Sequence, residues 1–359
     1  MLHGKRSDMV VHEEEPFNAE TARGALAEAS VTSTAAFFSR NHGAIPRSDP
    51  SSWRLSVDGL VDKQLSLSIE ELRERFAERE IVATLQCAGN RRQDLLEVRE
   101  IPGEAPWGPG ATGTATWRGV ALADVLQAAR PQDAAEHVAF VGADVSDEPQ
   151  PPEAYGASIP RRKAERSEVL LAWEMNGEAL PAVHGGPLRA VVPGFIGARS
   201  VKWLERIELR AAPWDGFFQS TAYRLLPPEG EAAPGAGIAL GEVALNSDIL
   251  APDDDARLSA GAIEVRGYAF AGGERRVVRV DVSLDAGDSW VQAELLEDLG
   301  RWAWRLWRTE LDLEPGSHEI VVRAWDSAAA SQPERPGPLW NPKGYVNNAW
   351  GRVRVLVET

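Results

Sequence analysis

The sequence predicts an α+β domain followed by a β-sandwich, and three observations support this fold class. In the first part, short helical and strand patterns mix without a regular βαβ repeat. A stretch rich in Pro, Gly and Ala then interrupts the chain at 227–241. Beyond it, short runs of alternating hydrophobicity are separated by Gly, Asp and Pro turns, as in a sandwich of two sheets. We place the first domain at residues 1–228, a linker at 229–235 and the second domain at 236–359.

Composition and charge exclude several classes of protein. The chain has 359 residues, which is enough for two domains of about 100–200 residues each. Hydrophobic residues make up 43% and charged residues 26%, so the chain is globular rather than disordered. No run approaches the roughly 18 apolar residues of a membrane helix, and no secretion signal is visible, so we expect a cytoplasmic protein. The net charge of −16 argues against nucleic acid or an anionic membrane as the main partner.

In the first domain, periodicity and capping signals predict the individual elements. Leu65–Ala77 is predicted as a helix, because Ser68 and Glu71, three residues later, have the pattern of a capping box. Apolar patterns predict a further helix at Val120–Arg130 and strands at Ile81–Gln86, Val138–Ala143 and Leu188–Val192.

In the second domain, five runs of alternating or nearly alternating hydrophobicity predict strands. They are Ile263–Phe270, Val277–Leu284, Arg301–Leu306, Glu319–Trp325 and Arg352–Val357. Seven of the 13 Trp residues lie between Trp290 and Trp350. Because so small a sandwich cannot bury them all, we expect some of them to pack on the first domain or on a second subunit.

The single cysteine, Cys87, lies in the most informative segment of the chain. One cysteine cannot form an internal disulfide, a four-cysteine zinc site or an iron–sulfur cluster. It leaves a strand into a turn of small residues that is followed by Arg91 and Arg92, which we expect to lower the thiol pKa and to attract anions. Three interpretations remain open at this point: a small buried hydrophobe, a thiolate ligand to a soft metal, and a nucleophile.

Several further motifs stand in order around this segment. The most specific is Cys87-Ala88-Gly89-Asn90-Arg91-Arg92. The others are Arg40-Asn41-His42 and the segments 154–160 (AYGASIP), 173–177 (WEMNG), 192–194 (VPG), 197–199 (GAR), 201–203 (VKW), 303–307 (AWRLW) and 348–350 (NAW). Together they resemble the molybdenum-cofactor domain of the sulfite oxidase family, and the resemblance spans about Phe37 to Trp350.

The resemblance implies a molybdopterin-binding catalytic domain and an immunoglobulin-like dimerisation domain. It also implies that Cys87 is the only protein ligand to molybdenum, since a soft thiolate suits a metal that also has sulfur ligands. The cofactor is then molybdenum-molybdopterin. Because the sequence shows no cytochrome b5 module and no flavin module, we expect no haem, and the electron acceptor stays open.

A set of cofactor contacts is implied by the same resemblance. Besides Cys87, they are Phe38, Ser39, Arg40, Asn41, His42, Arg92, Asp144, His184, Arg189, Ser200, Val201 and Lys202. Arg189 and Lys202 are suited to a terminal phosphate, while Asp144 and His184 are suited to hydrogen bonds with pterin amino groups.

Arg40, Lys343 and Tyr223 are implied to face the substrate. A guanidinium holds an oxyanion through two parallel hydrogen bonds, which is the role expected of Arg40. Lys343 stands where the family usually has arginine, and an ammonium cannot make that paired contact. Arg92 would add positive charge, and the phenol of Tyr223 would steer a proton.

The activity implied by these residues is oxidation of sulfite, a small anion, to sulfate. Lys343, and Ile101-Pro102 where animal members have a lysine near the pocket, weaken the inference to sulfite and leave room for another small oxyanion. Two alternatives are oxygen-atom transfer of the nitrate reductase type and a catalytically silent cofactor-binding homologue. The resemblance also implies that the second domain forms a homodimer.

Overall fold

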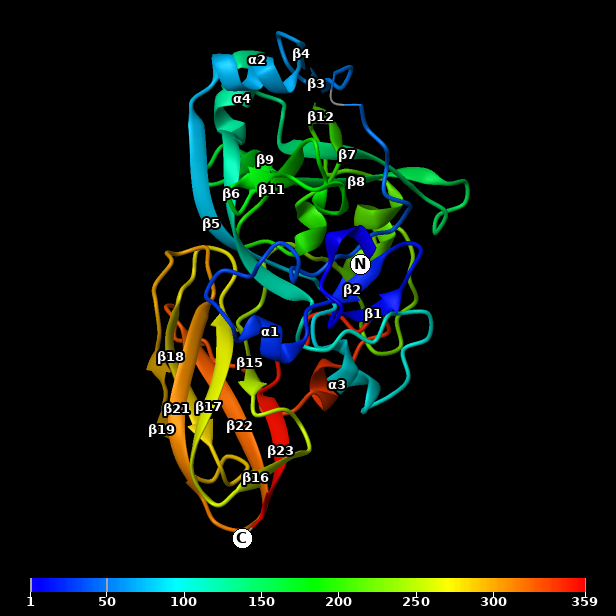
Figure 1. The fold of residues 1–359 in the computed structure, drawn as a ribbon. Helices are drawn as coiled ribbons and strands as arrows, with labels where there is room; N and C mark the ends of the chain where they lie inside the picture. Colours follow the sequence, from blue (N-terminus) through cyan, green and yellow to red (C-terminus); the bar gives the residue numbers. More distant parts are fainter. Residues whose placement is uncertain (1, 50, 359) are drawn as a thin grey trace.

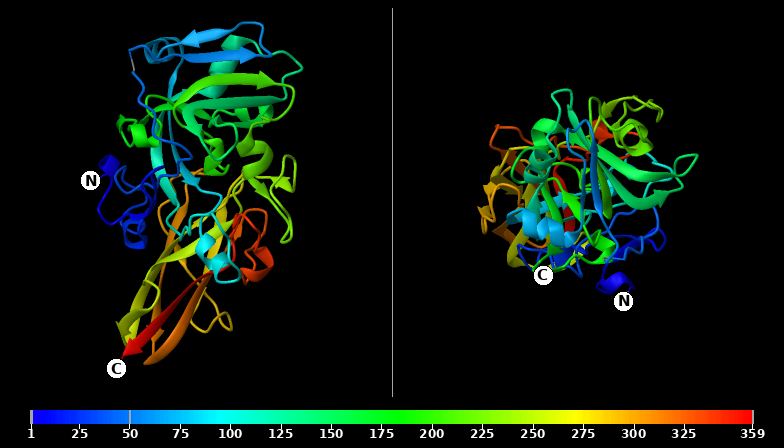
Figure 2. Two further views of the ribbon diagram at one scale, coloured as in Figure 1. Left: turned by 90° about the vertical axis from the view of Figure 1, so that its right-hand side faces the viewer. Right: turned by 90° about the horizontal axis from the view of Figure 1, so that it is seen from above.

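The computed structural model describes residues 2–49 and 51–358, so the outermost predicted domain limits, residues 1 and 359, lie outside the described residues. The α+β part and the β-sandwich follow one another along a long axis (Figures 1 and 2), which confirms the predicted fold class. The last strand of the sandwich runs toward its far tip, and the N-terminal hairpin lies beside the junction of the two parts (Figure 1). Among the described residues, none of the helices is both long and apolar enough to cross a membrane.

The first sheet carries the strand that leads to Cys87. Its order is β10-β9-β6-β5, with β11 paired to β9, and all its pairs are antiparallel. Its strands are β5 (Glu78–Gln86), β6 (Thr112–Ala121), β9 (Leu170–Met175), β10 (Glu178–Ala179) and β11 (Arg189–Val191). The first residues of β5 are exposed and the last four are buried, so the strand runs from the surface into the interior. Cys87 therefore begins a loop inside the molecule.

The second sheet has the order β4-β3-β12-β7-β8, and only β3 and β12 are parallel. Its strands are β3 (Leu55–Gly59), β4 (Leu65–Leu67), β7 (His137–Ser146), β8 (Glu153–Pro160) and β12 (Leu204–Arg210). Buried Val57, Phe140 and Ile207 pack in the main hydrophobic core. Near its end, β7 bears the buried carboxyl of Asp144.

The helices are short. They are α1 (Arg23–Leu26), α2 (Ile69–Arg75), α3 (Arg92–Leu96), α4 (Leu122–Ala129), α5 (Arg161–Ala164), the 3₁₀ turns η1 (Leu2–Gly4), η2 (Ala182–His184), η3 (Gly197–Arg199) and η5 (Gly337–Leu339), and the π-helical turn η4 (Phe218–Ala222). A small hairpin of β1 (Val10–Glu13) and β2 (Asn18–Glu20) precedes α1.

The predicted helix at Leu65–Ala77 is correct at its cap and wrong at its start. Ser68 and Glu71 make both hydrogen bonds of a capping box, at 3.1 and 2.8 Å, and α2 follows. Leu65 and Leu67, however, belong to β4, because pairing with β3 buries both side chains in the core. The predicted helix at Val120–Arg130 likewise loses its first two residues to β6.

The second part is a sandwich of two sheets, with orders β15-β17-β21-β20 and β16-β23-β22-β18-β19. Its strands are β15 (Asn246–Ala251), β16 (Ala256–Ser259), β17 (Gly261–Phe270), β18 (Val277–Ser283), β19 (Val291–Gln292), β20 (Glu294–Leu295), β21 (Arg305–Leu313), β22 (Gly316–Asp326) and β23 (Gly351–Glu358). Side chains from both sheets, among them Val280, Trp307, Val322 and Val353, form one core. Within the stretch rich in Pro, Gly and Ala at 227–241, β14 (Ile238–Ala239) pairs with β13 (Arg224–Leu225), and the domain limits stay predictions.

The predicted strand Arg301–Leu306 is wrong in its first four residues. They form a turn, and β21 begins only at Arg305. The turn is used to contact the first part: the Thr84 amide donates to the Trp302 carbonyl at 2.9 Å, and the Trp304 amide donates to Thr84 Oγ1 at 2.8 Å. The other four predicted strands correspond to β17, β18, β22 and β23.

Arg91 connects the two parts at their junction. Its side chain is 1% exposed, and its guanidinium donates to the carbonyl oxygens of Ala349 (2.8 Å), Ser247 (3.0 Å) and Trp350 (3.0 Å). The carboxylate of Asp248 lies 3.4 Å from Nε. Arg91 therefore joins the loop after Cys87 to the sandwich.

Tryptophan side chains of the sandwich segment also contact the first part. The indole of Trp304 donates to the Ser30 carbonyl at 2.8 Å, and that of Trp340 donates to the Arg99 carbonyl at 2.9 Å. The prediction that some of these residues pack on the first domain is confirmed.

Candidate active site

The loop that begins at Cys87 holds the thiol inside the molecule. Cys87 is 8% exposed, and the Gly89 amide donates to its sulfur at 3.4 Å. Gly89 is needed here because a Cβ would lie 2.6 Å from the guanidinium of Arg92, which folds back beneath the loop. Arg92 is the first residue of α3 and is itself buried.

The expected lowering of the Cys87 pKa is wrong for the protein without a bound metal. Burial raises the pKa of the thiol, and the positive charge of Arg92 only partly opposes this shift. Arg91 is not among the groups that shift the pKa of Cys87, because its side chain points away from the thiol and toward the sandwich. A metal ion would displace the thiol proton on binding, as metal–thiolate ligation requires.

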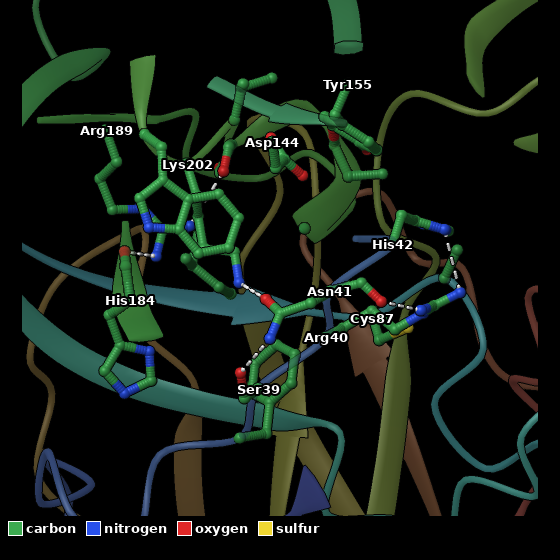
Figure 3. A pocket seen from close by; sticks show the side chains of 18 of the residues that line it. Ser39, Arg40, Asn41, His42, Cys87, Asp144, Tyr155, His184, Arg189 and Lys202 are labelled. Carbon is green, nitrogen blue, oxygen red and sulfur yellow. Dashed lines mark hydrogen bonds between the residues drawn. The ribbon is translucent and has the colours of Figure 1, made fainter. Parts of the chain in front are cut away.

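A cavity beside Cys87 brings most of the predicted residues together (Figure 3). Its lining includes every predicted site residue except Arg92 and Lys343, namely Phe38, Ser39, Arg40, Asn41, His42, Cys87, Asp144, His184, Arg189, Ser200, Val201, Lys202 and Tyr223. They come from the loop after α1, the residue that follows β5, β7, η2, β11, the turn before β12 and the end of η4. Segments distant in sequence therefore converge on one space.

One end of this cavity is strongly cationic. Arg189 donates to the carbonyls of His184 (2.8 Å) and Ser200 (2.9 Å), and the ammonium of Lys202 hydrogen-bonds Asn41 Oδ1 (Figure 3). Burial lowers the pKa of Arg189 to about 9, and burial together with Arg189 lowers the pKa of Lys202. Such cations are costly to bury without an anion, so this end suits a phosphate.

Asp144 offers a hydrogen-bond acceptor, which a pterin needs in addition to a site for its phosphate. Burial raises the pKa of its carboxyl to about 6, against the opposing charge of Lys202. Its Oδ1 is buried and has no hydrogen-bond partner within residues 2–49 and 51–358. Buried polar atoms are normally paired, so this oxygen is suited to a donor on a ligand. A soft thiol, an unpaired buried carboxyl oxygen and a cationic end together fit a molybdenum-pterin cofactor.

A second set of side chains links the cavity to the surface. His42 Nε2 lies 2.8 Å from the hydroxyl of Tyr223, and His42 Nδ1 hydrogen-bonds the carboxylate of Glu148. Burial, and then the charge of Arg40, lower the pKa of His42 to about 4, so the ring is neutral near pH 7. Tyr155 stacks on the His42 ring at 5.4 Å, and the Glu148 side chain is 45% exposed. The three groups Tyr223, His42 and Glu148 form a continuous path to solvent.

Lys343 lies in a second cavity, which Arg40 and His42 also line. The Arg92 guanidinium donates from Nε to the Lys343 carbonyl at 3.1 Å. Both cations contact the carboxylate of Glu104. The structure thus places Arg40 between the cavity beside Cys87 and the cavity of Lys343.

Sequence reasoning missed four side chains at this site. Tyr155 lies in the segment AYGASIP, a motif that already pointed to the family, so a signal for it existed. Glu104, Glu148 and Lys5 are in no motif. Lys5 is buried, its Nζ lies 2.5 Å from His184 Nε2, and burial lowers its pKa to about 7. These contacts join residues far apart in sequence, which local patterns do not reveal.

Comparisons with known proteins agree with this geometry. Residues 42–218 match the oxidoreductase molybdopterin binding domain, and residues 238–358 match the Mo-co oxidoreductase dimerisation domain. The sulfane dehydrogenase SoxCD from Paracoccus pantotrophus has the same fold, with a TM-score of 0.83, 26% sequence identity, and coverage of 99% of this chain and 91% of that chain.

Two relatives named sulfite oxidase cover nearly all of the chain. The protein of Gallus gallus is 44% identical and the alignment covers 95% of this chain and 76% of the relative. The protein of Arabidopsis thaliana is 38% identical, with 97% of this chain and 94% of the relative covered. The chain spans 65–66% of the length of the mammalian relatives it matches. It belongs to the sulfite oxidase family and is a molybdopterin-dependent oxidoreductase.

Proposed function

We propose that this enzyme oxidises sulfite to sulfate at a molybdenum-pterin cofactor held beside Cys87. The observation that carries the proposal is the position of Arg40, which lines both the cavity at the thiol and the second cavity. Two relatives named sulfite oxidase add support. When bound, the cofactor supplies the two-electron redox chemistry, and the electrons pass to an acceptor that stays open.

The residues of the first cavity would hold the cofactor. Cys87 provides the thiolate for the metal, and Arg189 and Lys202 provide charge for a phosphate. Asp144 Oδ1 accepts from a pterin donor. The remaining contacts proposed for the cofactor are Phe38, Ser39, Asn41, His42, His184, Ser200 and Val201.

Arg40 and Lys343 would orient the anion, and Arg92 would add positive charge next to Lys343. The Arg40 guanidinium has several donors, so it binds an oxyanion while it still contacts the Asn41 carbonyl. Conversion of sulfite and water to sulfate releases protons together with the two electrons. As a released proton reaches the oxygen of Tyr223, the phenol passes its own proton to Nε2 of neutral His42, and His42 passes its Nδ1 proton to exposed Glu148.

We expect turnover at saturating sulfite to fall as the pH drops through about 4. Below this pKa His42 is protonated, so its Nε2 cannot accept the Tyr223 proton. Tyr223→Phe should lower kcat by about a hundredfold, a normal contribution of general acid–base catalysis, and should remove this acidic limb. The measurement is kcat against pH for both proteins. An acidic limb that is unchanged in the Tyr223→Phe variant would contradict the relay.

Lys343→Arg should lower the KM for sulfite by about tenfold with little change in kcat. An arginine has donors left for the substrate after it pairs with Glu104, and one extra charge-assisted hydrogen bond is worth about 1.5–3 kcal/mol. Unchanged kcat is the pattern of uniform binding. If steady-state kinetics show the same KM in both proteins, Lys343 does not face the substrate.

The activity itself is tested by metal analysis and a substrate panel. Purified enzyme should contain about one molybdenum per chain, as a single thiolate ligand implies, and should release an oxidised pterin in acid. It should reduce ferricyanide with sulfite. Turnover only of nitrate with reduced viologen would favour the nitrate reductase alternative. Loaded enzyme that turns over neither substrate would be a silent homologue or would act on another oxyanion.

We also propose that the second part is an immunoglobulin-like domain through which the chain forms a homodimer. Three partly exposed tryptophans, Trp290, Trp325 and Trp350, surround Arg323 on its outer face, at 3.7, 4.5 and 5.7 Å from the guanidinium carbon. Trp and Arg are enriched at protein interfaces. We expect a sedimentation mass of about twice the 39.0 kDa chain at micromolar concentration. A mass of one chain would contradict this, and the cytoplasmic location stays a prediction.

A further inference from the structure

Glu104 occupies the position where the two cations behind the proposed substrate site meet. Its Oε1 lies 2.5 Å from Lys343 Nζ, and its Oε2 lies 3.1 Å from Arg92 Nη2. The Glu104 side chain is only 13% exposed, and it lines the same cavity as Arg40 and Lys343. A carboxylate of the chain thus makes the contacts that an oxyanion would make with this pair of cations.

Among the side chains that form ion pairs around Arg40 and Lys343, the charges nearly cancel. The other carboxylates that line this cavity are exposed to solvent and screened by it, namely those of Glu13, Glu15 and Asp147. Arg40, Arg92 and Lys343 are cationic, while Glu104 pairs with two of them and Glu148 lies 3.8 Å from Arg40 Nη2. One positive charge is left in this group. A singly charged anion would neutralise it, whereas a doubly charged anion would meet uncompensated repulsion from the two carboxylates.

We propose that Glu104 selects the charge of the ligand, so that the site takes singly charged oxyanions and disfavours doubly charged ones. The proposal rests on the function proposed above and specifies its substrate: hydrogen sulfite rather than the sulfite dianion. A dianion must compete with a tethered carboxylate that is already seated between Lys343 and Arg92. The same selection weakens the binding of sulfate, which is doubly charged near neutral pH, and so favours release of the product.

The test compares binding of a dianion and a monoanion to molybdenum-loaded enzyme. Sulfate and nitrate are titrated by calorimetry at pH 8 and constant ionic strength, because screening alters both affinities. Glu104→Gln should bind sulfate about tenfold or more tightly than the natural protein and nitrate within about threefold. In steady-state kinetics at this pH, the same variant should lower the KM for sulfite more than it changes kcat.

Asp147→Asn is the matched control. Asp147 lines the same cavity and is exposed, and within the described part of the chain it forms no ion pair with Arg40, Arg92 or Lys343. Removing its charge should change both affinities by less than about threefold, as for other solvent-exposed charges. Glu104→Asp keeps the charge and should keep sulfate binding weak. Molybdenum content and melting temperature check that each variant is folded and loaded.

The proposal is overturned if Glu104→Gln raises the affinity for nitrate as much as that for sulfate, or if it changes neither affinity. It is also overturned if Glu104→Gln changes the sulfate affinity no more than Asp147→Asn does. If Glu104→Gln does not load molybdenum, Glu104→Asp decides: sulfate binding more than about threefold tighter than in the natural protein, although the charge at position 104 is kept, overturns the proposal. Because anion titration needs no turnover, the outcome is independent of the activity. Charge selection without sulfite oxidation would refute the proposed function and the choice of hydrogen sulfite as substrate, and would leave the selection of singly charged oxyanions by Glu104 standing.

Discussion

Cys87→Ser is expected to abolish turnover and to leave the fold in place. A serine hydroxyl is a harder and poorer donor than a thiolate, so it does not reproduce the ligation on which the metal depends. The two side chains have nearly the same shape, and a serine oxygen accepts the hydrogen bond of the Gly89 amide in the same way. Steady-state sulfite oxidation and thermal unfolding measure the two effects.

The natural protein, prepared in parallel, is the control for cofactor loading. Molybdenum and released pterin are quantified in both proteins, so that lost turnover is separated from lost cofactor. A serine variant with a tenth or more of the natural turnover would mean that Cys87 is not the essential ligand.

Arg91→Met is expected to give the largest loss of stability. The change removes the closer of two cations beside buried Asp248, the other being Arg23 at 3.8 Å. It also removes the hydrogen bonds that the guanidinium donates to the carbonyls of Ser247, Ala349 and Trp350. Breaking a buried ion pair costs about 3–5 kcal/mol. At about 2–4 °C per kcal/mol for domains of 150–250 residues, the melting temperature should fall by roughly 6–20 °C.

Arg257→Met is the control for this experiment. Arg257 also pairs with a carboxylate, that of Glu358, but its side chain is 71% exposed, so its loss should cost less than about 1 kcal/mol. Differential scanning calorimetry of the two variants gives the comparison. Equal melting temperatures for Arg91→Met and Arg257→Met would show that the junction does not depend on the buried guanidinium.

What could be predicted from the sequence is what local chemistry determines. The capping box of Ser68 and Glu71 involves residues three apart, and it forms as predicted. The apolar spacing of Leu65 and Leu67 is compatible with a helix or with a strand. They form a strand because they pair with β3. In the same way, contacts of the 301–304 turn with Thr84 override its alternating pattern.

In the candidate site, too, residues in local motifs were predictable, and residues that meet only through the fold were not. Residues in recognisable motifs, such as Cys87, Arg40 and Lys202, line one cavity. The acids that set its charge were not predictable, because Glu104 meets Lys343 across 239 positions and Glu148 meets His42 across 106. The pKa of Cys87 was misjudged because burial, a property of the whole fold, outweighs the neighbouring charge.

Cys87 and Arg91 lie four positions apart in one loop and face opposite neighbours: the thiol faces the cavity, and the guanidinium is held by the sandwich. The sandwich therefore contributes to the rigidity of the loop that begins at Cys87, although within residues 2–49 and 51–358 no sandwich strand lines the cavity beside Cys87. The two parts are then not exchangeable modules. A chimera that joins this first part to a foreign sandwich must also carry over the acceptors of Arg91, because otherwise the loop that holds Cys87 loses these hydrogen bonds.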